Sequence, residues 1–119
     1  MSDELRRRFV DLGDWQAHYR ELGQTNKSTL VMFHGSPGSS FSLVPLMRAL
    51  AKDRHVVAID SRGNGDSTPF EHDAPSIADY ANAHWDVVDA IGFDRCDIYG
   101  YHTGAAICTE LSIKHGDRI

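Results

Sequence analysis

The sequence contains no long hydrophobic run, and this absence argues against a membrane-spanning helix. No window approaches the roughly 18 consecutive apolar residues that a span requires. The first residues, Met1 to Leu5, include Asp3 and Glu4. A secretory signal peptide would instead begin with basic residues and continue with an apolar stretch. The sequence therefore predicts a cytoplasmic protein that does not have a membrane as its partner.

Cysteine is also scarce. Cys96 and Cys108 form no C-x-x-C pair, and each lies in an apolar segment, so two buried free thiols are favoured over a disulfide or a redox pair. The seven histidines show no H-E-x-x-H motif and no comparable ligand spacing. The sequence accordingly predicts no metal site, and nothing in it indicates a cofactor.

An excess of positive charge is missing as well. The net charge is −5, and the one basic cluster, Arg6-Arg7-Arg8, leads directly into Phe9-Val10. A nucleic-acid-binding domain would carry a basic face, so nucleic acid is not the expected partner. Repeats, low-complexity tracts and Pro/Ser linkers are absent too. With 119 residues, 41% of them hydrophobic, the chain is predicted to form one unit of ordinary globular composition.

The residues that are present alternate between strand and helix patterns. Continuous apolar runs with β-branched residues are typical of strands buried on both faces, whereas apolar residues at spacings of three and four indicate helices. An opening hairpin turns at Gly13-Asp14. Strands are predicted at 7–12, 15–21, 28–33, 55–59 and 96–99, and helices at 42–52, 76–91 and 103–115. This order predicts an α/β fold, with a mostly parallel sheet, flanking helices and an opening β-hairpin.

Local signals support the predicted helix ends. Pro45 is tolerable only in the first turn of its helix. Ser76 and Asp79 form a capping pair, and Gly92 and Gly116 are placed to end the two later helices.

A Gly-rich or polar loop follows each of the three central strands. These loops are His34–Gly38, Asp60–Ser67 and Gly100–Gly104. In parallel α/β sheets the chemistry lies beyond the carboxyl ends of the strands, so we expect the three loops to form one site. In the last loop, two glycines flank a residue at the tip of a tight turn from strand to helix, the layout of a nucleophile elbow. The residue at that tip is His102.

Together these loops resemble the α/β-hydrolase fold superfamily. His34-Gly35-Ser36-Pro37-Gly38 is similar to the H-G-x-P-G oxyanion loop of that family, and the segments from Asp60 to Ser67 and from Gly100 to Gly104 match its next two loops. The opening segment from Phe9 to Gly23, with its H-Y-x-x-x-G ending, matches as well. The resemblance runs from about residue 6 to 119 and implies a hydrolase acting on a small-molecule substrate.

The resemblance also implies roles for three residues. His102 takes the nucleophile position, and the backbone N–H groups of Ser36 and Thr103 take the positions of the two oxyanion donors. Because Thr103 opens a helix, its N–H has the positive end of the helix dipole behind it. Each such donor stabilises a transition state by on the order of 3 kcal/mol.

Histidine departs from the serine, aspartate or cysteine that this family places at the tip. Imidazole is largely unprotonated at neutral pH and can attack an ester without a separate base. It is also bulkier than a serine side chain and would fill the space in which a carbonyl approaches the two donors. Two interpretations therefore stay open: His102 reacts, or it marks a scaffold that has lost or changed the usual hydrolysis.

A second departure is that the family places its catalytic acid and histidine after the elbow, and neither occurs before Ile119. We therefore expect residues 1–119 to be a single incomplete domain, completed by a partner chain or by a missing C-terminal half. The predicted function is the N-terminal part of a hydrolase of a small ester, lactone or related carbon–heteroatom bond, inactive alone. The alternatives are a non-catalytic module that binds a small molecule or a partner, and a lyase or isomerase that uses His102 as a base.

The remaining polar residues are interpreted as structural. Arg62 and Asp66 are expected to hold neighbouring loops by hydrogen bonds, and His84 to be a satisfied core histidine. Without a neighbour, the predicted strand at 96–99 would expose an apolar edge, so the isolated chain is expected to be poorly soluble or partly folded. A sharp cooperative thermal transition of the monomer would refute this expectation.

Overall fold

A computed structural model of the chain describes residues 4–119. Met1 to Asp3, on which the expectation of a cytoplasmic location partly rests, lie outside the described residues. The described part forms a five-stranded sheet in the order β1-β2-β4-β3-β5. The strands are β1 (Arg6–Asp11), β2 (Gln16–Leu22), β3 (Thr29–Phe33), β4 (His55–Ile59) and β5 (Asp97–Gly100).

The sheet is mixed. β1 pairs antiparallel with β2, and β2 antiparallel with β4, whereas β3 runs parallel to both β4 and β5. The opening hairpin thus extends a parallel core, and the predicted α/β class is confirmed. The turn between β1 and β2 contains Gly13 with φ 96°, a conformation that glycine adopts without strain.

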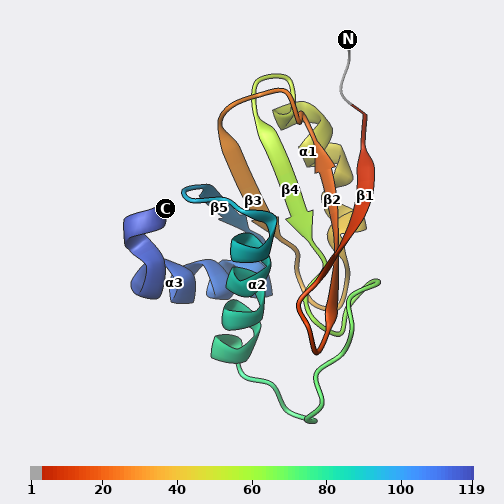
Figure 1. Cartoon of the computed structure of the whole chain (residues 1–119), viewed down its shortest axis with the longest axis vertical. Coiled ribbons are helices and arrows are strands. Elements are labelled where there is room, and N and C mark those ends of the chain that lie inside the picture. The colour runs from red at the N-terminus through yellow and green to blue at the C-terminus, as the bar shows by residue number, and fades with distance from the viewer. Residues whose placement is uncertain (1–3) are drawn as a thin grey trace.

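Helices cover both faces of the sheet (Figure 1), with α2 (Ile77–Ile91) and α3 (Thr103–His115) on one face and α1 (Val44–Leu50) on the other. Alternate residues of β3 and β4 point to opposite faces, so Val31 and Phe33 belong to the core beneath α2 and α3, and Leu30 and Met32 to the core beneath α1. Both central strands are therefore apolar at every position except their first.

The sequence signals at the helix ends are largely confirmed. Ser76 and Asp79 form a reciprocal capping box at the start of α2, and Gly92 ends that helix with φ 102°. Pro45 lies in the first turn of α1, as predicted. The predicted helix at 42–52 is instead split into a 3₁₀ turn, η1 (Ser40–Leu43), followed by the shorter α1.

The end of α3 differs from the prediction. Gly116 has φ −58°, so it does not form a left-handed cap, and the chain continues into a further 3₁₀ turn, η2 (Gly116–Arg118). β5 begins one residue later than predicted. Both cysteines are free; Cys96 is buried and Cys108 is half-buried. No helix in the part of the chain that the structure describes is long and apolar enough to cross a membrane.

Candidate active site

His102 occupies the tip of a strained turn between β5 and α3. Its backbone has φ 59° and ψ −115°, and it is the sole non-glycine residue with positive φ among residues 4–119. Such a conformation costs on the order of 1–3 kcal/mol and persists where the surrounding structure enforces it. The turn projects the exposed side chain of His102 beyond the carboxyl end of β5.

The two glycines of the elbow enforce this conformation by close packing. A Cβ atom at Gly100 would lie 2.1 Å from the carbonyl oxygen of Gly104, and one at Gly104 would lie 2.2 Å from the carbonyl oxygen of Phe33. Both contacts are with backbone, which cannot rotate away as a side chain can. The start of α3 therefore rests directly against β3, and the predicted need for glycine at both positions is confirmed.

The loop after β3 lies beside the elbow, and the two enclose an open hollow. Its volume is about 310 Å³. Its lining comes from the elbow, from the loop that follows β3 and from η1: Gly35, Ser36, Pro37, Gly38, Ser42, Tyr101 and His102. Thus two of the three loops predicted to meet contribute to this hollow, with the imidazole in its wall.

The two predicted oxyanion donors are close together, but one of them has a partner within the protein. The Ser36 N–H donates a hydrogen bond of 2.8 Å to the side-chain oxygen of Thr103. Thr103 is the first residue of α3, so its own N–H has no acceptor within the helix. Thr103 Oγ1 also lies 3.4 Å from Nδ1 of His102. The hydroxyl of Thr103 therefore connects His102 at the tip of the turn with the loop after β3.

A buried layer of histidines lies beneath these loops. The Ser61 N–H donates to Nε2 of His34 at 2.9 Å, which assigns the ring proton to Nδ1, and Nδ1 donates to the carbonyl of Gly35 at 2.8 Å. His34 thus ties the loop after β3 to the loop after β4. His84 of α2 lies on the other side of Ser61, with 3.0 Å between its Nε2 and the Ser61 hydroxyl.

His84 is only half satisfied, in contrast to the prediction that it is a satisfied core residue. Its Nδ1 is buried without a hydrogen-bond partner, and its ring packs against Phe33 at 4.6 Å between centroids. Burial, with a smaller contribution from neighbouring His34, lowers the pKa of His84 to about 3, although Asp60 acts in the opposite direction. The folded protein therefore holds this imidazole neutral.

We expect the neutral His84 to make the fold sensitive to mild acid. Because the folded pKa lies below the ordinary value of 6.5, the unfolded chain takes up the proton first, and stability falls from about pH 6.5 down to about pH 3. Between pH 7.5 and pH 5 the loss due to His84 is about 2 kcal/mol. Urea titrations at the two pH values should show that His84→Gln removes most of this difference.

Exposed His72 provides the control for this prediction. It lies on the surface beside Asp79, and His72→Gln should leave the pH-dependent loss as it is in the unmodified chain. Equal pH sensitivity in the unmodified chain and His84→Gln would contradict the assignment to His84.

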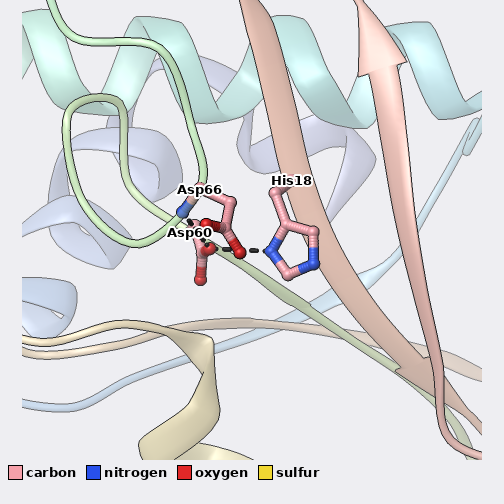
Figure 2. A group of neighbouring side chains, drawn as sticks. All are labelled: His18, Asp60 and Asp66. Atoms are coloured by element: carbon pink, nitrogen blue, oxygen red, sulfur yellow. Dashed lines mark hydrogen bonds and ion pairs between the residues drawn. The ribbon is translucent and has the colours of Figure 1, made fainter.

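The loop after β4 is held by a network around Asp60 (Figure 2). Asp60 is buried and accepts hydrogen bonds from the backbone N–H groups of Ser40 and Asp66, at 2.8 and 2.9 Å, and from Nδ1–H of His18 at 2.7 Å. Burial alone would raise the pKa of the Asp60 carboxyl, but these donors together outweigh burial and hold that pKa below its usual range. The carboxylate therefore fastens β2, the loop after β3 and the loop after β4 to one another.

One nitrogen or oxygen atom from each of His18, Asp60 and Asp66 lies within 4.8 Å of the others, a spacing compatible with a metal ion. These groups already have protein partners, however. Nε2 of His18 accepts from Arg7 at 3.1 Å, Asp66 pairs with the Arg7 guanidinium, and Arg20 lies 3.9 Å from Asp60. Because the arginines already balance the two carboxylates, the geometry favours a structural clamp over a metal centre.

Arg62 acts differently from the prediction. Instead of hydrogen-bonding between loops, its guanidinium stacks over the rings of Trp15 and Phe70, 4.9 and 4.7 Å from their centroids. Asp66 does link the loop to β1 through Arg7, as expected of a structural residue. Sequence reasoning missed the roles of His18, Ser61 and the Thr103 hydroxyl; the sole signal was that each lies in or beside a family-like motif.

Comparison with known proteins decides the family. A family profile described as alpha/beta hydrolase fold matches residues 28–119, which is most of the chain. The chain belongs to the α/β-hydrolase fold family. The predicted resemblance is thereby confirmed.

Several curated α/β-hydrolases are similar in sequence. The chain is 31% identical over 99 residues to epoxide hydrolase 3 of Mus musculus, covering 82% of this chain and 27% of the relative. It is 28% identical over 95 residues to a protein named putative carbamate hydrolase RutD of Caulobacter sp. (strain K31), covering 80% and 35%. The chain thus spans about a third of the length of these hydrolases.

Solved α/β-hydrolase structures extend the likeness to nearly every residue. A bacterial membrane phospholipase A superposes with a TM-score of 0.90 at 26% identity, covering 97% of this chain and 37% of that structure. Epoxide hydrolase A from Mycobacterium thermoresistibile gives 0.88 at 25% identity, with 98% and 37% covered. The five strands and three helices described here therefore correspond to about a third of each of these solved structures.

Proposed function

We propose that the chain supplies the nucleophile-bearing part of a hydrolase site that acts on a small ester, lactone or related carbon–heteroatom bond. The observation that carries the proposal is the strained backbone of His102, which holds an imidazole at the tip of a nucleophile elbow and beside a hollow of about 310 Å³. Strain of this kind is concentrated at functional sites, because a structural residue gains nothing from it.

In this proposal the imidazole of His102 attacks the reacting carbon of the substrate, while backbone N–H groups receive the developing negative charge. The Thr103 N–H is the first donor. The Ser36 N–H is the second, and a substrate oxygen reaches it by displacing the Thr103 hydroxyl. The names of the relatives extend the candidate substrates from esters and lactones to carbamates and epoxides.

A second candidate function is a non-catalytic module that binds a partner chain. The observation that favours it is the position of β5, which pairs with β3 and with no other strand in residues 4–119. In this alternative, a strand from a partner chain or from a C-terminal continuation completes the sheet at this edge. If the chain is such a binding module, the variant His102→Asn should not change the rate of any reaction.

Because an imidazole needs no separate base to attack an ester, this proposal departs from the expectation that the chain is inactive alone. The test is the hydrolysis of small activated esters and lactones by the purified chain and by His102→Asn. Asparagine tolerates positive φ better than most residues and is not a nucleophile. We expect His102→Asn to lower the initial rate by on the order of 10²-fold or more. His72→Asn changes another exposed histidine and is the matched control, for which we expect an unchanged rate. Equal rates for all three proteins would exclude His102 from the reaction.

A further inference from the structure

The chemistry of an imidazole at the elbow divides the candidate substrates into two classes. We propose that the site turns over acyl compounds, namely esters, lactones and carbamates, and that an epoxide instead alkylates His102 permanently. This inference rests on the proposed function, because it requires His102 to attack the substrate. It goes further because it states from which of the two substrate classes His102 can be regenerated.

The two ring nitrogens of His102 lie in different surroundings. Nδ1 of His102 lies 3.4 Å from Thr103 Oγ1, and the hydroxyl can accept a hydrogen bond from Nδ1–H or donate one to an unprotonated Nδ1. Before substrate binds, the same oxygen accepts the Ser36 N–H. In the tautomer with the proton on Nδ1, the lone pair belongs to Nε2, the ring nitrogen farther from the backbone. Both reactions below start from this tautomer, with Nε2 as the nucleophile.

An acyl substrate permits a complete cycle. The Nε2 lone pair forms a bond to the carbonyl carbon, the C–O bond to the leaving alcohol breaks, and the alkoxide takes up the proton that the ring loses from Nδ1. The product is a neutral N-acylimidazole. Water then adds to its carbonyl carbon, the C–N bond breaks, and the acid and the original imidazole are formed. N-acylimidazoles are activated acyl donors, so this second step requires no further catalytic group from the chain.

An epoxide permits only the first half of such a cycle. Nε2 attacks a ring carbon, the strained C–O bond breaks, and the new alkoxide takes up the proton lost from Nδ1. The product is an N-(2-hydroxyalkyl)imidazole. Its new bond joins nitrogen to a saturated carbon, which has no carbonyl for water to attack. An aspartate at the same tip would form an ester, whose carbonyl water can attack; a histidine cannot be regenerated in this way.

The surroundings of His102 make it more reactive than an ordinary surface histidine. It is exposed at the rim of the hollow, and the Thr103 N–H at the start of α3 can receive an oxyanion that forms there. Exposed His72 pairs at 3.3 Å with Asp79 of the α2 capping box, in which side chains already accept the first backbone N–H groups. It therefore serves as the internal reference within the same chain.

The experiment is intact-mass and peptide mass spectrometry after incubation with p-nitrophenyl acetate or with styrene oxide. With the ester we expect many nitrophenol molecules per chain and a transient acetyl group on His102. With the epoxide we expect at most one stable adduct per chain, located at His102 and formed on the order of tenfold or more faster than any at His72. Chains that carry the adduct should no longer hydrolyse the ester.

The two failures are distinguishable. Repeated conversion of styrene oxide to the diol that His102→Asn abolishes, without an adduct, would overturn the inference while leaving a reactive His102 in place. Absence of ester turnover, together with labelling of His102 no faster than His72, would overturn the proposed function and the inference with it. Circular dichroism of His102→Asn and His72→Asn establishes that each variant is folded before rates are compared.

Discussion

Replacing Gly104 with alanine is expected to lower the free energy of unfolding by roughly 3 kcal/mol or more, enough to unfold a marginal domain. The added Cβ atom would lie 2.2 Å from the carbonyl oxygen of Phe33 and 2.8 Å from its carbonyl carbon. Phe33 belongs to β3, which pairs with a strand on each side and cannot yield without breaking those pairs. Urea denaturation followed by circular dichroism measures the effect.

Gly116 is the matched control for this variant. It has φ −58°, and an added Cβ atom would meet nothing within 4 Å. Gly116→Ala should leave stability unchanged or raise it by up to about 1 kcal/mol, since alanine restricts the unfolded chain. Similar midpoints for the two variants would show that α3 does not depend on close contact with β3.

The second large effect is expected for Asp60→Asn, which we expect to lower the free energy of unfolding by about 3 kcal/mol. The amide is nearly the same size as the carboxylate. Both carboxylate oxygens of Asp60 accept hydrogen bonds, from Ser40, Asp66 and His18, so the NH₂ group of asparagine would replace an acceptor and face a donor. The negative charge that balances Arg20 is lost as well. The midpoint in urea should fall accordingly at neutral pH.

Asp66→Asn provides the comparison within the same loop. Its carboxylate is half exposed and pairs with Arg7 on the surface, and its backbone N–H to Asp60 survives the substitution. Its expected effect is within about 0.5 kcal/mol. If Asp66→Asn proved as damaging as Asp60→Asn, surface pairing with Arg7, and not the buried carboxylate, would be the main support of the loop.

The strand order and the elbow could be predicted because they depend on local patterns and on three motifs in sequence. Val56 to Ile59 form a continuous apolar run, and such runs occur in strands covered on both faces. The capping residues Ser76 and Gly92 interact with residues close to them in sequence, so the ends of α2 can be predicted from the local sequence alone. The glycines at 100 and 104 likewise indicate a close approach of one backbone segment to another.

The remaining features depend on contacts between distant segments. His18 meets Asp60 across 42 positions, and Ser36 meets Thr103 across 67. No local pattern predicts such pairs, because each joins residues from different strands and loops that only the folded sheet brings together. Arg62 was predicted to hydrogen-bond, but it lies between two aromatic rings from separate segments, and stacking replaced that role.

If the strain at His102 is retained for a reaction, His102→Gly should relieve the strain and remove the reaction. Glycine adopts φ 59° and ψ −115° readily, so the variant should gain about 1 kcal/mol in stability. The decisive measurement is the rate of p-nitrophenyl acetate hydrolysis by this variant. We expect the rate to fall to that of the uncatalysed reaction, in a chain that unfolds at a higher temperature. An unchanged rate would show that the strain at His102 is not retained for a reaction.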